Sequence, residues 1–281
     1  MRHLRLNQFP SVAANAQSVL VTDELIDQSV HAICLRLGGT AFTRAHITSL
    51  NIKLDGKDIV PSISGAMLQK QNDYEGLDDD ATFLWYFFGD PTAQTIKGQH
   101  LGDLDLSIYR KPLEIRVDIG GATAPTLEVR ALASVPKMAM GIGFDEIEAA
   151  QIGVMTRTVI QPAAAIARKA YGISLGSTPG ARIRRVYFHH ANVTKLEHRK
   201  QGLTKQDDFD SVDLGAVVKN YGRYPQTGLL VMDKVFDGNQ GEAETTINTE
   251  GRPWNQEIML TTSAADTITA FAQLHASWPQ L

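Results

Sequence analysis

Short apolar or alternating runs, interrupted by turn residues at regular intervals, fill the chain from residue 17 to residue 135. This pattern is typical of a β-sandwich or barrel. The strands that we expect lie at residues 18–21, 30–37, 46–54, 57–60, 82–88, 104–109, 113–119 and 126–133. Asp55 and Gly56 separate two of these runs and favour a type I′ hairpin, in which both central residues need positive φ. Eight strands in one such stretch predict a jelly roll.

The second half of the chain repeats this pattern. Residues 135–143 mix proline, glycine and methionine, and we interpret them as an interdomain connection. Beyond them, strands are expected at residues 150–160, 182–189, 193–198, 227–236, 243–249, 257–261 and 267–274, with a hairpin turn at Asp237-Gly238-Asn239. Short helices are expected at residues 65–71, 162–171 and 212–221, the second of them begun by Pro162 and capped by Gly172.

The prediction is therefore an all-β chain of two tandem eight-stranded jelly rolls, a double jelly roll, with a few short helices in its loops. An N-terminal arm is expected at residues 1–16, the first jelly roll at residues 17–136 and the second at residues 137–281. A chain of 281 residues can bury roughly 75% of its extended surface, so folding requires neither disulfides nor a metal. The single cysteine, Cys34, lies in an apolar run and is expected to be a buried thiol.

Charge and hydropathy narrow the classes of partner. The formal net charge of −4 is spread over both halves, so the basic excess of a duplex-binding domain is missing and no specific nucleic acid is expected as a partner. The N-terminus lacks the apolar core of a secretory signal. The longest dense apolar stretch, residues 81–88, is far shorter than the roughly 20 residues of a transmembrane helix. We expect synthesis in the cytoplasm.

One motif resembles a catalytic one. Gly172-Ile173-Ser174-Leu175-Gly176 has the spacing of a nucleophile elbow, which needs a strand before the serine and a helix after it. Because a helix is expected before this motif, we interpret it as a glycine-rich loop. Neither a catalytic nor a cofactor-binding residue is predicted, and the chain is not expected to be an enzyme.

A group of histidines raises the question of a metal site. His189, His190 and His198 lie near Glu197 in the sequence. Adjacent residues of a strand point to opposite faces, so His189 and His190 cannot both face one ion. We favour a polar strand end, and the sequence leaves the identity of any metal ligand open.

Charged and aromatic clusters suggest contacts between subunits. The basic residues between positions 182 and 205 are expected to form a solvated or intersubunit face: Arg182, Arg184, Arg185, Lys195, Arg199, Lys200 and Lys205. The acidic runs Asp78–Asp80 and Asp207–Asp210 and the loop Asp237–Glu242 lack EF-hand spacing, but they could hold structural calcium at a subunit contact. Residues 83–88 place aromatic side chains on both faces of one strand, which predicts contact with a second domain or subunit.

The order and spacing of these features resemble one known family over nearly the whole chain. The residues that carry the resemblance are Pro10 with Val12–Ala14, Leu35–Gly39, Ile52–Lys57 and the helix after it, Pro179–Ile183, Tyr224–Asp237 and Ile268–Trp278. They are similar to the major capsid proteins of corticoviruses, which are tailless icosahedral bacteriophages with an internal membrane and a double jelly-roll coat subunit.

The resemblance implies a structural protein of the virion. Two sandwiches would stand side by side in one subunit, and three subunits would form a pseudo-hexameric capsomer. Such capsomers would contact one another and tile an icosahedral shell over the membrane. An N-terminal arm carrying Arg2, His3 and Arg5 would lie near anionic lipid headgroups or minor capsid proteins.

A two-domain β-sandwich that binds carbohydrate or a receptor, such as a lectin-like module or a viral spike, is the alternative. Sites of that kind present exposed aromatic side chains with polar groups beside them. Trp254, between Pro253 and Asn255 in a loop, is the candidate residue.

Overall fold

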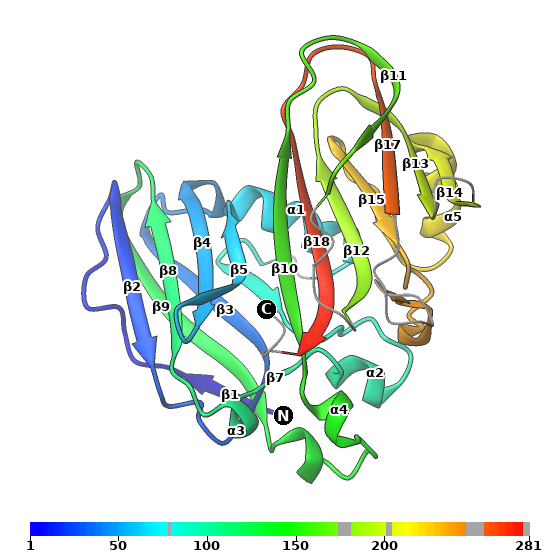
Figure 1. Ribbon diagram of the computed structural model, residues 1–281. Coiled ribbons are helices and arrows are strands. Elements are labelled where there is room, and N and C mark those ends of the chain that lie inside the picture. The colour runs from blue at the N-terminus through cyan, green and yellow to red at the C-terminus, as the bar shows by residue number, and fades with distance from the viewer. Residues whose placement is uncertain (78–79, 174–180, 201–203, 246–255, 278–281) are drawn as a thin grey trace.

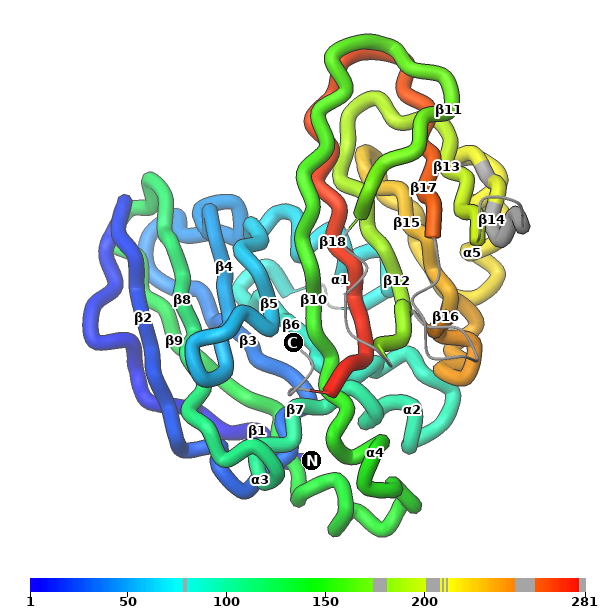
Figure 2. The backbone as a smooth tube through the Cα atoms, viewed as in Figure 1, coloured from blue at the N-terminus to red at the C-terminus, as the bar shows by residue number. Residues whose placement is uncertain are grey.

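Two β-sandwiches stand side by side in the computed structural model, which describes all residues except 78–79, 174–180, 201–203, 246–255 and 278–281 (Figure 1). The first sandwich contains strands β1 to β9 and the second contains β10 to β18. Helix α1 (Gly65–Glu75) lies where the two meet. The backbone trace in Figure 2 shows the second sandwich rising above the first, with β10 (Gln151–Ile160) beside β5 (Lys57–Ile63).

Each sheet of the first sandwich has four long strands in antiparallel pairing. One sheet has the order β1 (Arg2–Arg5), β9 (Thr123–Ser134), β3 (Ser29–Thr40), β6 (Phe83–Phe87), with the two-residue strand β7 (Leu104–Asp105) paired to β3. The other sheet has the order β2 (Ala16–Thr22), β8 (Leu113–Ile119), β4 (Ile47–Leu54), β5. Seven of the eight expected strands are thus present, the eighth is reduced to the two-residue β7, and β1 is a strand that was not expected.

The second sandwich repeats the first strand for strand. Its sheets have the orders β10, β18 (Ile268–Ser277), β12 (Arg182–His189), β15 (Leu229–Asp233) and β11 (Ile166–Tyr171), β17 (Gln256–Thr262), β13 (Val193–Lys200), β14 (Thr204–Asp210). The short strand β16 (Glu244–Thr245) pairs with β12 as β7 pairs with β3. Adding nine to each strand number of the first sandwich therefore gives the order in the second.

The helices follow the same duplication. α1 follows β5, and its equivalent α5 (Ser211–Lys219) follows β14. α2 (Ile96–His100) stands between β6 and β7, as the 3₁₀ turn η3 (Gln240–Glu242) stands between β15 and β16. The remaining short elements are η1 (Arg44–His46), α3 (Leu106–Tyr109), η2 (Lys137–Ala139) and α4 (Glu146–Ala149). Among the described residues, no helix is long and apolar enough to cross a membrane.

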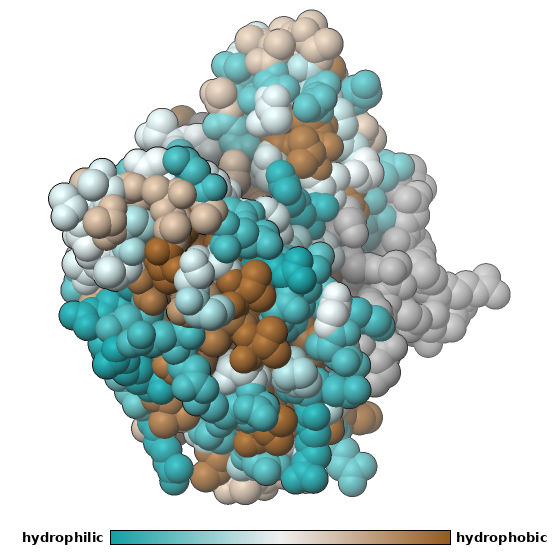
Figure 3. Space-filling model, turned by 90° about the vertical axis from the view of Figure 1, so that its left-hand side faces the viewer, coloured by the Kyte–Doolittle hydropathy of each residue, from teal (hydrophilic) through white to brown (hydrophobic). Residues whose placement is uncertain are grey.

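Alternating side chains build the core. On β8 the residues Leu113, Ile115, Val117 and Ile119 are buried, and the residues between them are partly exposed. One apolar cluster runs through both sandwiches, so the described parts of the two jelly rolls share a core. Cys34 is buried, as predicted. Seen from the side of the first sandwich, the surface is a mixture of polar side chains and separate hydrophobic patches (Figure 3).

Several local predictions are confirmed. Asp55 and Gly56 have φ values of 49° and 80° and join β4 to β5 in a hairpin. The Ser64 side chain accepts a hydrogen bond from the Met67 amide and begins α1, and the helix ends at Gly76, with φ of 71°. The expected helix at 212–221 is present as α5.

The expected helix at residues 162–171 is wrong. Residues Ile166–Tyr171 form β11 instead, an edge strand that pairs with β17. The helix-forming alanines misled the prediction, because sheet pairing overrides a weak local propensity. Arg168 adopts a φ of 52° at the register shift between Ile166 and Lys169.

Two further strand predictions are wrong in detail. Of the expected strand 104–109 only Leu104–Asp105 is a strand, because the Asp105 side chain accepts a hydrogen bond from the Ser107 amide and begins α3. Asp237-Gly238-Asn239 forms a turn but not a hairpin, since β15 and β16 both pair with β12 rather than with each other.

The first residues of the chain belong to a sheet. In the segment 1–16, expected as an arm, residues Arg2–Arg5 form β1 and pair with β9 in register from Arg2↔Ala133 to Arg5↔Arg130. Arg5 also forms an ion pair of 2.8 Å with Glu128. His3 is exposed on this edge strand.

Candidate functional site

The histidines expected at a polar strand end do not converge. The His189 side chain lies against Gln71 at 3.2 Å, whereas His198 lies beside Lys234 and Gln256. Glu197 forms an ion pair of 3.0 Å with Arg168. These residues therefore form no common metal site in the described part of the chain.

The basic residues of the second jelly roll are paired within the subunit, which corrects the expectation of a solvated or intersubunit face. Arg182 donates to the Gly241 carbonyl oxygen at 2.9 Å. Lys195 and Lys200 form ion pairs with Asp208 and Glu244. The other described members are Arg184 and Arg185, which are buried, and Arg199, which pairs with Glu197. The side chain of Lys205 lies outside the described residues.

The described carboxylates of the acidic runs stabilise turns, a helix end or an ion pair. Asp80 accepts from the Thr82 amide at 2.9 Å, and Asp237 accepts from the Asn239 amide at 2.9 Å. Asp210 begins α5 by accepting from the Val212 and Asp213 amides. Asp78 and Asp79, together with Ser174 and Trp254, lie outside the described residues. Calcium binding at these runs stays a prediction.

The aromatic strand β6 has two distinct faces. Leu84, Tyr86 and Phe88 point into the core and are buried. Phe83, Trp85 and Phe87 form a half-buried ladder on the opposite face, with 5.7 Å between the ring centres of Trp85 and Phe87. Both faces carry large apolar groups, as predicted, but the outward face is only partly covered within the subunit.

Buried charges meet at the junction of the two jelly rolls. Arg185 on β12 forms ion pairs of 3.2 Å with Glu75, 2.9 Å with Asp90 and 3.1 Å with Asp233. Arg184 pairs with Asp90 at 2.9 Å, and Arg223 pairs with Asp233 at 3.4 Å. None of these six side chains is more than 6% exposed. Three arginines thus balance three carboxylates; Glu75 and Asp90 come from the first jelly roll and the other four residues from the second.

Neutral groups complete this junction. The Tyr187 hydroxyl donates to Glu75, and the Gln240 amide nitrogen donates to Asp90 at 2.8 Å. The Thr92 hydroxyl donates to the other oxygen of Asp90 at 2.6 Å. A buried carboxylate is tolerated when hydrogen bonds and opposite charges satisfy its oxygens, and these contacts meet that condition.

The charge balance sets the protonation states. Burial alone would raise the pKa of Asp90, but Arg185 and Arg184 lower it well below its ordinary value. Burial alone would lower the pKa of Arg185, but Asp233, Asp90 and Glu75 raise it well above the usual range. Burial and the adjacent Glu75 raise the pKa of Tyr187 well above its ordinary value. At neutral pH the arginine and aspartate are therefore charged and the phenol is neutral.

This junction could not be predicted from the sequence, because its partners are distant in the chain. Glu75 lies 110 residues before Arg185, and Asp90 lies 95 residues before it. One signal was present: two adjacent arginines stand between Ile183 and Val186 in a run expected as a strand. Arginine inside such a run indicates a buried pair, since an unpaired charge is too costly to bury.

Two jelly rolls of one topology, sharing a core and locked by buried ion pairs, define a rigid building block of the double jelly-roll capsid class. Models of a coat protein family identify the particular family. The viral coat protein P2 N-terminal domain matches residues 3–136, and the viral coat protein P2 C-terminal domain matches residues 155–276. The chain belongs to the viral coat protein P2 family, and it is a structural, non-enzymatic component of a virion capsid.

Solved structures share the fold. The major capsid protein P2 of bacteriophage PM2 has 20% sequence identity and a TM-score of 0.79, with 99% of this chain and 97% of that chain covered. A chain of Sulfolobus turreted icosahedral virus has 12% identity and a TM-score of 0.67, covering 99% and 91%. A chain of the PBCV-1 virus capsid has 10% identity and a TM-score of 0.62, covering 99% and 96%. A comparison with curated protein sequences finds no match.

Proposed function

We propose that three copies of this capsid protein close into a ring of six jelly rolls, the pseudo-hexameric capsomer. In this proposal the contact between subunits repeats the contact between the two jelly rolls inside one subunit. The observation that carries it is the duplication: one of two equivalent helices covers a sheet of the other jelly roll, whereas the second presents a row of side chains that the described part of the chain leaves exposed.

Inside the subunit, helix α1 of the first jelly roll covers a sheet face of the second jelly roll. Lys70, Gln71, Tyr74 and Glu75 of α1 contact the second jelly roll. Gln71 lies against His189, and the Tyr74 and Tyr187 rings meet edge to face at 6.3 Å. Glu75 pairs with Arg185, and Lys70 donates to the Thr227 carbonyl oxygen. This row on α1 therefore covers the outer face of the sheet that contains β12 and β15.

The equivalent row, on α5 and the turn that follows it, is exposed. Counted from the helix-capping residues Ser64 and Asp210, the four contact positions of α1 correspond to Ala216, Val217, Asn220 and Tyr221. All four are exposed, and Val217 and Tyr221 retain 51% and 52% of their accessible surface. Two large apolar side chains in a row of this kind favour a second protein surface as their partner.

The equivalent sheet face is only partly covered within the subunit. β3 and β6 of the first jelly roll occupy the places of β12 and β15, and their outer face carries the aromatic ladder of β6. Arg5, Arg36 and Arg130 beside it all pair with the single carboxylate of Glu128, which leaves an excess of positive charge. The first turns of α5 carry the carboxylates of Asp210 and Asp213, so the two surfaces are complementary in charge as well as in apolar character.

Each copy thus offers one helix row and one sheet face. A contact between different surfaces of identical chains is heterologous, and it produces a closed ring when the rotation closes. Three copies place six jelly rolls around the ring, and capsomers of this outline would tile the icosahedral shell over an internal membrane. The exposed basic end of β1, with Arg2 and His3, supports the further proposal of contact with lipid headgroups or minor capsid proteins.

The test is the native mass by light scattering after size exclusion. A trimer has a mass of 3 × 30.7 = 92.1 kDa. We expect this mass for the unmodified chain and a 30.7 kDa monomer for Val217→Asp. Ile147→Asp on α4 is the matched control, because Ile147 is also an exposed helical residue, 72% accessible, and lies outside the proposed contact. A trimer that Val217→Asp leaves intact would refute this interface, and a monomeric unmodified chain would refute the capsomer.

A further inference from the structure

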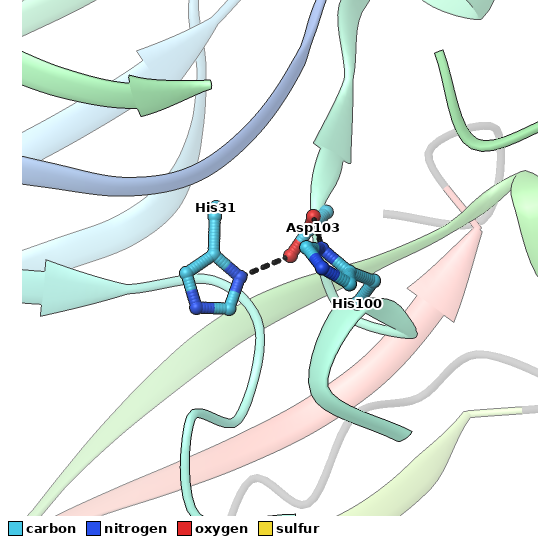
Figure 4. Close-up of side chains that lie close together, drawn as sticks. All are labelled: His31, His100 and Asp103. Carbon is cyan, nitrogen blue, oxygen red and sulfur yellow. Dashed lines mark hydrogen bonds and ion pairs between the residues drawn. The ribbon is translucent and has the colours of Figure 1, made fainter. Parts of the chain in front are cut away.

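His31, His100 and Asp103 converge at one buried point that the capsid role does not explain. His31 lies on β3, His100 is the last residue of α2, and Asp103 lies in the loop before β7. Figure 4 shows both imidazoles next to the Asp103 carboxylate. The His31 Nδ1 atom lies 2.7 Å from Oδ1 of Asp103, and the His100 Nδ1 atom lies 2.6 Å from Oδ2. The side chains of His31, His100 and Asp103 are 4%, 13% and 0% exposed.

We propose that this cluster, two imidazole nitrogens and a carboxylate, is a structural site for a divalent transition-metal ion of the Zn²⁺ type. One ligand atom from each residue lies within 4.8 Å of the others, and in the described part of the chain no other group of three such ligands does so. Imidazole nitrogen and carboxylate oxygen are ligands that Zn²⁺ uses, at about 2.0–2.2 Å.

The imidazole rings already have the spacing that one ion requires. With a Zn–N distance of about 2.1 Å and about 1.1 Å from nitrogen to ring centre, each ring centre stands about 3.2 Å from the ion. Two rings at the tetrahedral angle would then have centres about 5.2 Å apart. The observed distance between the His31 and His100 ring centres is 5.2 Å, with the planes inclined by 57°.

Binding would require only a small movement of the carboxylate. Ligand atoms of a tetrahedral Zn²⁺ ion are about 3.4 Å apart. The ion would replace the Nδ1 protons that now join the imidazoles to Asp103, and the carboxylate would move away from each nitrogen by less than about 1 Å.

The surrounding backbone holds the ligands in place. The Phe88 amide donates to the His31 carbonyl oxygen at 2.9 Å, and the Asp103 amide donates to the His100 carbonyl oxygen at 3.1 Å. A Cβ atom at Gly89 would lie 2.5 Å from Oδ1 of Asp103 and 2.6 Å from Nδ1 of His31, so a glycine is required beside the cluster.

The position of the site gives a bound ion a structural consequence. Gly102, next to Asp103, accepts a hydrogen bond from the Gly153 amide of β10 at 2.6 Å. An ion that joins α2 and its following loop to β3 would therefore also fix the place where the second jelly roll begins. Because the site is formed by the fold, binding would stabilise the native chain against unfolding.

The experiment uses the full chain after treatment with a chelator, and Zn²⁺ as the probe. Calorimetric titration should show one tight equivalent per chain. At free Zn²⁺ about 100-fold above its dissociation constant, the unfolding equilibrium should shift about 100-fold towards the native state, which raises the melting temperature by about 5–10 °C. His100→Asn keeps an N–H donor for Asp103 but removes the ligand, and it should abolish both effects. His3→Gln removes an exposed histidine of β1 and should change neither.

A spectroscopic measurement on the unmodified chain keeps the test independent of how the variant folds. Co²⁺ bound at this site should give the visible absorption of a four-coordinate ion with nitrogen and oxygen ligands, which one equivalent of Zn²⁺ removes. Absence of a stoichiometric site in the unmodified chain, or a tight equivalent that persists in His100→Asn, would overturn the proposal.

Discussion

Replacing Arg185 with methionine should remove the central cation of the junction between the jelly rolls. Methionine keeps an unbranched apolar stem, so the change acts mainly on the charge. Glu75 would then lose its ion pair, and Asp90 and Asp233 would each keep one arginine. Breaking a buried pair from one side typically costs about 3–5 kcal/mol, because the remaining charge stays buried without its partner. We expect a loss of that size in the free energy of unfolding.

Urea denaturation followed by circular dichroism, together with calorimetry, measures this loss. For a chain of this size each kcal/mol lowers the melting temperature by roughly 2–4 °C, so the variant should melt about 6–20 °C lower. Arg110→Met is the matched control, because Arg110 and its partner Asp27 are 68% and 61% exposed. An exposed pair contributes at most about 1 kcal/mol.

The combination of Arg185→Met with Glu75→Gln tests the cause. If the unpaired Glu75 carboxylate is what destabilises the variant, neutralising Glu75 should recover part of the lost free energy of unfolding. A double-mutant cycle should then give a coupling energy between the two positions of at least about 1 kcal/mol. A loss below about 1 kcal/mol for Arg185→Met, or additive effects in the cycle, would refute the account of the junction as a coupled charge network.

Two further predictions concern the same region. Burial, with Lys70 nearby, lowers the pKa of His189 to about 3, so between about pH 6.5 and pH 3 the unfolded chain takes up a proton that the folded chain refuses. As the pH falls, this group should lower the free energy of unfolding by up to about 1.4 kcal/mol per pH unit. The urea midpoints at pH 7 and pH 5 should therefore differ less for His189→Gln than for the unmodified chain. Equal differences would contradict this prediction. Gly153→Ala should destabilise the junction, because the new Cβ atom would lie 2.1 Å from the Phe88 carbonyl oxygen. Gly121→Ala is the control and should not destabilise the chain, because open space surrounds Gly121. Equal melting temperatures for the two variants would count against this close approach.

The strands of the fold could be predicted because their signal is local. On β8 and β9 every second side chain is buried, and this alternation is visible in the sequence. The same reasoning located the Asp55-Gly56 hairpin, α1 and α5. It failed for β11, whose residues are mostly exposed and whose strand conformation depends on pairing with the distant β17.

The sites could not be predicted because their members meet only in three dimensions. His31 is 72 residues from Asp103, and no local window contains both. The spacing of His100 and Asp103 was visible, but two ligands three residues apart are common in loops and turns. The same limit applies to Glu75, Asp90 and Asp233 around Arg185. Side chains that are distant in the sequence and meet only in the folded chain produce no periodic pattern in the sequence.

The two equivalent helices show how one duplicated element can serve two different contacts. The row on α1 is polar and pairs with buried arginine, and buried ion pairs tolerate little variation in distance or angle. The equivalent row presents Val217 on α5 and Tyr221 in the turn after it, and apolar contacts depend less on exact geometry.

This difference follows from what each contact must do in the proposed capsomer. The contact within the chain forms once, during folding, and has to fix the angle between the jelly rolls. The contact between chains forms afterwards from separate molecules, where burying charges would cost desolvation before any pair could form. An apolar helix row with acidic residues near its start avoids most of that cost, while its charge still guides the correct partner surface into place. Tyr221→Glu, which gives this row the acidic character of the α1 row, should therefore weaken assembly without affecting the fold of the subunit. A dilution series followed by light scattering measures the first effect, and the melting temperature of the monomer measures the second.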